Sequence, residues 1–277
     1  MEVTCDRSLK SGRAETRWRM AREKARLDKL IFDRGMASSR ERARALIMAG
    51  HVVVSDHVAD KAGQMVPVDV DIRLKGDVLP FVSRGGLKLQ KALDEFGVDV
   101  SGLVVLDVGA STGGFTDCLL QRGARKVIAV DVGYGQLAWK LRTDERVMNL
   151  EKTNIRHLEP GRLEELPDMA VIDASFISLA KVLPNTIRLI KDGGSVIALI
   201  KPQFEVGRGE VGKGGVVRDE KKHREVTESI RTLAGNLGLE VQGETESPIL
   251  GPKGNREFLI YLRKRVEERG IHDEVRE

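Results

Sequence analysis

Lys201 stands where a strongly apolar segment, Gly194–Ile200, meets Pro202. A lysine in an apolar setting or close to other cations gives up its proton readily and can then act as a base. The chemistry favoured here is proton removal beside a bound cofactor. Taken alone, Lys201 also fits a simpler reading, a solvated lysine that follows a strand.

A glycine-rich segment and a later acidic residue fit a nucleoside-containing cofactor. Gly109-Ala110-Ser111-Thr112-Gly113-Gly114-Phe115 is close to a dinucleotide fingerprint, but Ser111 replaces the second glycine, which argues against a pyrophosphate. Asp131 follows about 20 residues later, ends the next apolar run and can accept hydrogen bonds from a ribose diol. S-adenosylmethionine fits best, because its adenosyl group carries no phosphates. The glycines alone also fit a tight turn without a ligand.

We expect the cofactor to be held by residues of this turn, by Asp131 and by a residue after a further short strand. These residues are Gly109, Ser111, Thr112, Gly113, Gly114, Asp131 and Asn154.

Four apolar runs, expected as strands, end at these candidate positions. The runs are Leu103–Val108, Val127–Val130, Met169–Ile172 and Val196–Ile200, and the residues after them include Gly109, Asp131, Asp173 and Lys201. Helical patterns lie between the runs, which predicts a parallel, doubly wound α/β sheet with ligands beyond the carboxyl ends of its strands. Glu240–Glu246 and Glu257–Leu262 are expected to close it as an antiparallel pair.

Composition excludes several classes of protein. The 277 residues are 41% hydrophobic and 32% charged, enough for a medium domain plus a small one. The net charge is +4 and the isoelectric point about 9.0, a weak sign of a polyanionic partner. Cys5 and Cys118 lie far apart, which offers neither a disulfide framework nor zinc spacing and fits the cytoplasm. No stretch is apolar enough for a membrane span or signal peptide, and no metal is expected.

Residues 25–80 have the pattern of a small separate module. Leu27, Leu30 and Ile31 predict a helix that stops at Gly35, and Ser38 with Glu41 predicts a capping box that opens a second helix. Strands are expected at Val52–Val54, at Val58 and along the alternating Val66–Ile72. The basic residues Lys29, Arg40 and Arg44 crowd these helices, and Arg40 and Arg44 share one face. That face is either solvated or binds phosphates.

This module resembles the ribosomal S-four type RNA-binding domain. The similarity rests on Arg26-Leu27-Asp28-Lys29-Leu30, Ser38-Ser39-Arg40, Ala43, Leu46-Ile47 and Gly50-His51-Val52-Val53-Val54. The resemblance implies recognition of folded RNA by shape and phosphates.

The rest of the chain resembles the TlyA-type ribosomal RNA methyltransferases and, more widely, the FtsJ-like ribose 2′-O-methyltransferases. The motifs are Ser83–Leu89, Asp107–Thr116, Asp131–Leu137, Ser175–Leu179 and Lys201–Glu205. The resemblance implies a Rossmann-like sheet, S-adenosylmethionine as cofactor and a cytidine ribose of ribosomal RNA as substrate. It also implies a catalytic tetrad, which by motif falls on Lys88, Asp173, Lys201 and Glu257.

Such a tetrad suits a ribose hydroxyl, which is a poor nucleophile until its proton leaves. Lys201, neutral in the loaded site, would take the proton, and Lys88 would stabilise the developing oxyanion. Asp173 and Glu257 would orient the two lysines and balance their charge. No metal is required.

Further basic residues are candidates for RNA contact. Arg84 precedes the expected helix of Lys88, and Arg208 and Lys213 lie in a glycine-rich loop that is either a lid over RNA or a plain surface loop. The expected organisation is a basic arm at 1–24, an RNA-binding domain at 25–80, a methyltransferase domain at 81–265 and a charged tail at 266–277. Met20 is an equally good start for the natural chain.

Two other functions stay open at this point. A non-catalytic RNA-binding or ribosome-assembly factor could keep the same fold, although an intact tetrad argues against it. Relatives have also carried a haemolysin label, but the sequence offers no apolar helix suited to lysis. The oligomeric state and the form of the RNA substrate, naked or assembled, are not predicted.

Overall fold

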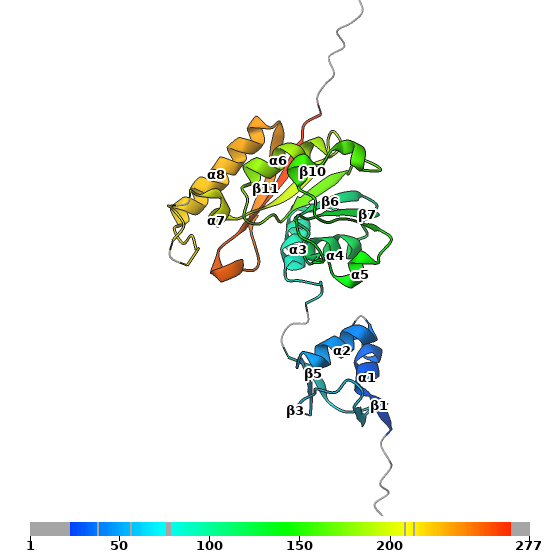
Figure 1. Cartoon of the computed structure of the whole chain (residues 1–277). Helices are drawn as coiled ribbons and strands as arrows, with labels where there is room; N and C mark the ends of the chain where they lie inside the picture. The colour runs from blue at the N-terminus through cyan, green and yellow to red at the C-terminus, as the bar shows by residue number, and fades with distance from the viewer. Residues whose placement is uncertain are drawn as a thin grey trace, which may run out of the picture. The chain divides into compact units, whose positions relative to one another are not determined.

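The computed structural model describes residues 23–37, 39–55, 57–75, 79–207, 209–212 and 214–266 (Figure 1). The chain divides into two compact units, Met1–Val78 and Leu79–Glu277. The expected basic arm, the greater part of the expected tail, and the residues Ser38, Arg208 and Lys213 lie outside the described residues.

The first unit combines two helices with five short strands. The helices are α1 (Leu27–Asp33) and α2 (Arg40–Met48), and the strands are β1 (Lys24–Arg26), β2 (Val52–Val54), β3 (His57–Val58), β4 (Met65–Pro67) and β5 (Ile72–Leu74). Strands β1 and β4 pair, and β3, β2 and β5 form a second sheet. Leu27, Ile31, Ala43, Ile47 and Val52 are fully buried and form the core of this unit.

Two details of the first unit differ from the sequence prediction. The N-cap of α2 is Ser39, whose hydroxyl accepts a hydrogen bond from the Arg42 amide, rather than Ser38. The single strand predicted along Val66–Ile72 is two strands in different sheets. Pro67 ends the first of them, because the Val70 amide turns back to the Pro67 carbonyl.

The second unit is built on a seven-stranded sheet in the order β11-β12-β10-β9-β6-β7-β8. The strands are β6 (Val104–Val108), β7 (Lys126–Val130), β8 (Val147–Leu150), β9 (Met169–Ile172), β10 (Ser195–Ile200), β11 (Leu239–Glu246) and β12 (Phe258–Lys264). Strands β8, β7, β6, β9 and β10 are parallel, and β12 and β11 are antiparallel. The predicted doubly wound, mostly parallel sheet with a closing antiparallel pair is confirmed.

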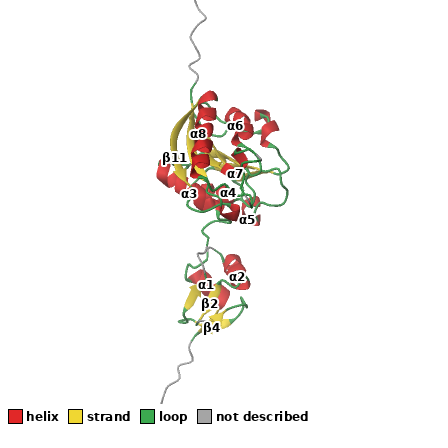
Figure 2. Cartoon of the chain, turned by 90° about the vertical axis from the view of Figure 1, so that its left-hand side faces the viewer, coloured by secondary structure: helices red, strands yellow, loops and turns green. Residues whose placement is uncertain are grey.

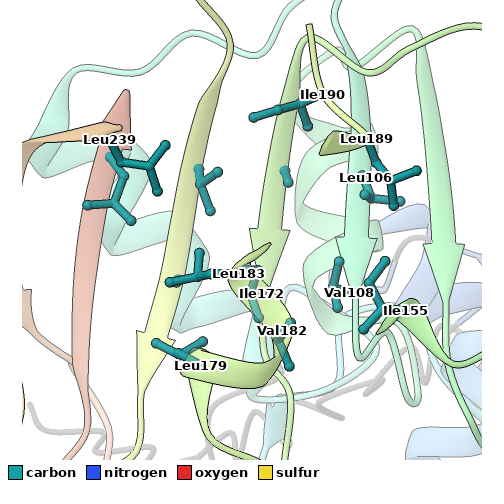
Figure 3. Close-up of a cluster of buried hydrophobic side chains, with 14 of the residues drawn as sticks. Leu106, Val108, Ile155, Ile172, Leu179, Val182, Leu183, Leu189, Ile190 and Leu239 are labelled. Carbon is teal, nitrogen blue, oxygen red and sulfur yellow. The ribbon is translucent and has the colours of Figure 1, made fainter. Parts of the chain in front are cut away.

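Helices cover both faces of this sheet, as Figures 1 and 2 show. They are α3 (Gly85–Phe96), α4 (Gly114–Gln121) and α5 (Trp139–Arg142) on one face, and α6 (Leu179–Arg188) and α8 (Glu220–Asn236) on the other, with the short α7 (Pro202–Glu205) directly after β10. Three 3₁₀ turns complete the unit: η1 (Ile155–His157), η2 (Pro160–Arg162) and η3 (Pro252–Gly254). Each face has its own apolar core, and Figure 3 shows the one beneath α6, which includes Leu106, Ile172 and Leu183.

The chain reverses its direction across the sheet between β6 and β9. From β6 the sheet grows outward through β7 and β8, and then the chain returns to add β9 and β10 on the other side. Ligands in such sheets bind in the crevice beyond the carboxyl ends of the strands at this switch point. Gly109 follows β6 and Asp173 follows β9, so the fold places the candidate residues at the crevice.

Candidate active site

The two lysines and two carboxylates of the expected tetrad form two ion pairs in one cavity. Lys201 Nζ lies 2.6 Å from Asp173 Oδ1, and Lys88 Nζ lies 2.5 Å from Glu257 Oε2. Lys88, Lys201 and Glu257 are buried, and all four residues line a cavity of about 690 Å³. The structure therefore brings together four residues that lie far apart in the sequence.

Strand register explains how these residues meet. Ala198 of β10 is level with Ile172 of β9, so Asp173 and Lys201 leave neighbouring parallel strands at the same edge. Ile200 is also opposite Phe258 of the antiparallel β12, which brings Glu257 next to Lys201 on the other side. The burial of four ionisable groups is costly unless they are paired, as they are here.

Lys201 has a further partner that sequence reasoning missed. Its Nζ lies 2.7 Å from Ser175 Oγ and 3.4 Å from the Asp173 carbonyl oxygen. Ser175 lines the same cavity. The hydroxyl and the carboxylate together fix the direction of the amine at the end of β10.

Glu257 has one carboxylate oxygen that is still open to a donor. Oε2 binds Lys88, whereas the buried Oε1 finds no hydrogen-bond partner within the described ranges. Gly251 packs against this carboxylate so closely that a Cβ there would lie 2.1 Å from Oε1. A donor that enters the cavity would meet an acceptor already desolvated, and unmade hydrogen bonds of buried acceptors are costly.

The turn after β6 is shaped by close approaches of the backbone. Gly109 has φ +85°, and a Cβ on it would lie 2.9 Å from the Asp173 carbonyl oxygen. A Cβ on Gly114 would lie 2.2 Å from Ser83 Oγ, so this glycine lets α4 approach α3. Gly109, Ser111, Thr112 and Gly114 line the large cavity. Gly113 does not, because it faces Leu137 and Leu141 and acts as the N-cap of α4.

Asp131 and Asn154 line a second cavity of about 550 Å³, together with Gly109 and Ser111. Asp131 Oδ2 accepts the Ser111 amide at 2.8 Å, and Oδ1 accepts the Gly133 amide at 2.6 Å. Ser111 has φ +49°, a strained conformation that aims its N–H at the carboxylate. Both oxygens of a carboxylate have further lone pairs for a diol.

The two cavities share a wall made of residues from two strand ends. Gly109, Ser111, Asp173, Ser175 and Phe176 line both. A group bound in the second cavity would therefore lie beside the lysine pairs of the first.

Phe176 is a second residue that the sequence prediction did not single out. Its side chain is 90% exposed, its φ is +64°, and its ring packs on Phe204 at a centroid distance of 5.1 Å. An exposed phenylalanine in a strained conformation is unusual for packing alone, and such strain clusters at functional sites.

Glu205 ties the Phe176 segment to α7. Its carboxylate accepts Ser178 Oγ at 2.6 Å and the Leu179 amide at 2.9 Å, at the start of α6. Burial raises the pKa of Glu205 above its ordinary value. This clamp joins the segments that carry Ser175 and Lys201.

Asp107, at the end of β6, is a fully buried carboxyl. Thr116 Oγ1 donates to its Oδ2 at 2.6 Å, and Oδ1 has no partner in the described part of the chain. Burial raises the pKa of Asp107 to about 7, and the nearby Asp173 and Asp131 add to the rise.

Of the basic residues expected to contact RNA, Arg40 and Arg44 lie on one face of α2 and both reach Asp28. Lys29 pairs with Asp33 on α1, and Arg84 lines the large cavity. Within the described residues there is no helix long and apolar enough to cross a bilayer. The same residues contain no cluster of three or more potential metal ligands.

The fold and site define an α/β enzyme whose ligand crevice lies beside two lysine–carboxylate pairs. The profile of the FtsJ-like methyltransferase family matches residues 81–264, and that of the S4 domain matches residues 25–72. The chain belongs to the FtsJ-like methyltransferases, to the TlyA-type group with an N-terminal S4 domain. The resemblance read from the motifs is confirmed.

Individual relatives support this placement. YqxC of Bacillus subtilis is 49% identical over 244 residues, which cover 88% of this chain and 87% of YqxC. The 16S/23S rRNA (cytidine-2′-O)-methyltransferase TlyA of Mycobacterium tuberculosis is 44% identical over 261 residues, covering 92% of this chain and 97% of TlyA. A solved structure from Streptococcus thermophilus, which carries the hemolysin name, aligns with a TM-score of 0.68 at 47% identity over 88% of this chain and 90% of that one.

Proposed function

We propose that the protein transfers a methyl group from S-adenosylmethionine to the ribose 2′-hydroxyl of a cytidine in ribosomal RNA, in the cytoplasm. The observation that carries the proposal is the pair of lysine–carboxylate contacts in a cavity that shares a wall with a nucleoside-sized second cavity. The TlyA relative named as a cytidine-2′-O-methyltransferase supports the substrate.

The second cavity fits S-adenosylmethionine. Asp131 would hold the ribose diol, Asn154 would lie near the adenine, and the turn from Gly109 to Gly114 would carry the amino-acid end. The cradle is tight, because a Cβ on Gly133 would lie 3.0 Å from Asp131 Oδ1. When bound, the cofactor supplies an electrophilic methyl group on a sulfonium.

The residues of the first cavity would prepare the hydroxyl. Lys201, as the neutral amine, takes the 2′-hydroxyl proton, and Asp173 and Ser175 hold the resulting ammonium in place. Lys88 stabilises the charge that develops on the oxygen, and Glu257 fixes Lys88. Phe176 offers an exposed ring face for a nucleobase turned out of its stack.

Residues 25–80 would capture the RNA and residues 81–265 would carry out the transfer. Arg40 and Arg44 are the proposed phosphate contacts of the first unit, together with Lys29, and Arg84, Arg208 and Lys213 are those of the second. A purely RNA-binding role is less well supported, because it would not require four ionisable side chains paired in a cavity.

The test is transfer of a tritiated methyl group to naked ribosomal RNA, separate subunits and whole ribosomes, followed by mass-spectrometric mapping. The proposal expects label on a ribose 2′-oxygen in at least one of these substrates. Label on a base, or no label in any of them, would overturn it.

A further inference from the structure

Asp28 in α1 is a fully buried carboxylate at the meeting point of three arginines. Arg26 binds it with two contacts, Nε to Oδ1 at 3.0 Å and Nη2 to Oδ2 at 2.9 Å. Arg40 Nη2 and Arg44 Nε reach the same Oδ2 at 3.3 and 3.1 Å. Three guanidinium nitrogens from three places in the sequence therefore converge on one oxygen atom.

The arginines themselves remain largely open to solvent. Their side chains are 46%, 43% and 51% exposed, whereas that of Asp28 is 0% exposed. Each guanidinium carries five N–H donors, and no more than two of any one are directed at Asp28. The cluster presents a dense set of donors around a hidden anion.

The charge balance of the cluster points outward. Arg26 alone, with its two-pronged contact, would satisfy the buried carboxylate. The hydrogen bonds of Arg26 in particular hold the pKa of Asp28 well below its usual range. Arg40 and Arg44 then add two positive charges beyond what Asp28 can neutralise, an arrangement that repels itself until an anion arrives.

We propose that Asp28 is a positioning residue for RNA binding, which fixes Arg26, Arg40 and Arg44 as a preformed site for a backbone phosphate. Long arginine side chains lose rotamer freedom when they bind, and a site ordered in advance avoids that loss. This inference rests on the proposed function, because it deepens the contact with RNA.

The proposal predicts an effect opposite to that of charge alone. Asp28→Asn makes the surface more positive by one unit, so a simple electrostatic surface should bind RNA more tightly. If Asp28 orders the arginines, affinity for purified large ribosomal subunits falls instead, by about tenfold. The salt dependence also becomes shallower, by about one unit for each phosphate that the arginines no longer neutralise.

The matched control is Asp33→Asn, which removes one negative charge from the same helix at an exposed position paired with Lys29. Its affinity should equal or slightly exceed that of the wild type. Binding of polyuridylate serves as the nonspecific reference, where both variants should behave alike. Asp28→Asn that binds subunits as tightly as Asp33→Asn overturns the proposal.

A structural role is separated by a second background. In Arg40→Ala/Arg44→Ala, Asp28→Asn should cost little further affinity, because the groups it positions are largely gone. An equal loss in both backgrounds would mean that Asp28 only holds up the fold, and would overturn the proposal.

A fold-neutral variant keeps the test decisive if Asp28→Asn does not fold. Arg40→Lys/Arg44→Lys keeps every charge and leaves the Arg26 contact intact, yet should weaken subunit binding several-fold because lysine lacks the fixed donor fork. Unchanged affinity would overturn the inference. Methyl transfer by the wild type on the same subunits tests the proposed function separately.

Discussion

At the scale of single residues, the site depends on contacts that pair each charged group with a specific partner. Asp131 accepts two backbone amides and would add a ribose diol to them. We expect Asp131→Ala to weaken S-adenosylmethionine binding by about 1–3 kcal/mol, the scale of a lost hydrogen bond to a charged group. Calorimetry measures this directly, with the exposed Asp94→Ala as the control. Equal affinities for the two variants would contradict the cofactor assignment.

Ser175 gives a second prediction at this scale. Its hydroxyl lies 2.7 Å from Lys201 Nζ, so Ser175→Ala should remove one partner of the amine without emptying the cavity. Turnover should fall by about tenfold, the worth of one hydrogen bond to a charged group, while cofactor affinity stays the same. Single-turnover methylation and calorimetry separate the two effects. A variant that loses cofactor binding but keeps its turnover would exclude this role for Ser175.

At the scale of elements, β6 and α4 are joined by Asp107 and Thr116. The folded chain holds the Asp107 proton up to a pKa of about 7, against an ordinary value of 3.8. Between these values the folded state binds more protons than the unfolded state, so this group makes stability fall as pH rises from about 4 to about 7. The full effect is about 4 kcal/mol at most.

Asp107→Asn should remove that pH dependence, because an amide does not ionise. Urea unfolding at pH 5 and pH 8 measures it. The wild type should lose more stability between these two values than the variant does. Parallel stability–pH curves would show that the carboxyl is not held protonated.

Other elements show what sequence patterns can and cannot predict. The buried parallel strands are runs of Val, Ile and Ala, so their ends, and with them Gly109, Asp131, Asp173 and Lys201, followed from the pattern. The Val66–Ile72 prediction was wrong, because alternation alone does not register the break at Pro67. The contacts of Ser175, Phe176, Glu205 and Asp28 depend on partners distant in sequence, and no local pattern signals them. For Asp28, the only signal in the sequence was a set of three arginines spaced around one acid.

At the scale of the whole molecule, RNA capture and cofactor binding belong to different compact units. Arg40→Ala/Arg44→Ala should therefore weaken RNA binding and reduce its salt slope by about two units, while cofactor affinity stays at the wild-type value. Filter binding over a salt series and calorimetry provide the two readouts. A loss of cofactor affinity would show that the units are not independent, and an unchanged salt slope would mean that this face is merely solvated.

The central claim is that Lys201 is the base, and one comparison of variants tests it most directly. Single-turnover methylation is measured for Lys201→Ala and Lys201→Arg, with cofactor and RNA binding checked in parallel. The account predicts that both variants bind normally and that both lose on the order of 100- to 10,000-fold in rate. Arginine does not rescue, because a guanidinium stays protonated at any working pH. A Lys201→Arg enzyme with near-normal rate would contradict the account and leave Lys201 as a fixed positive charge.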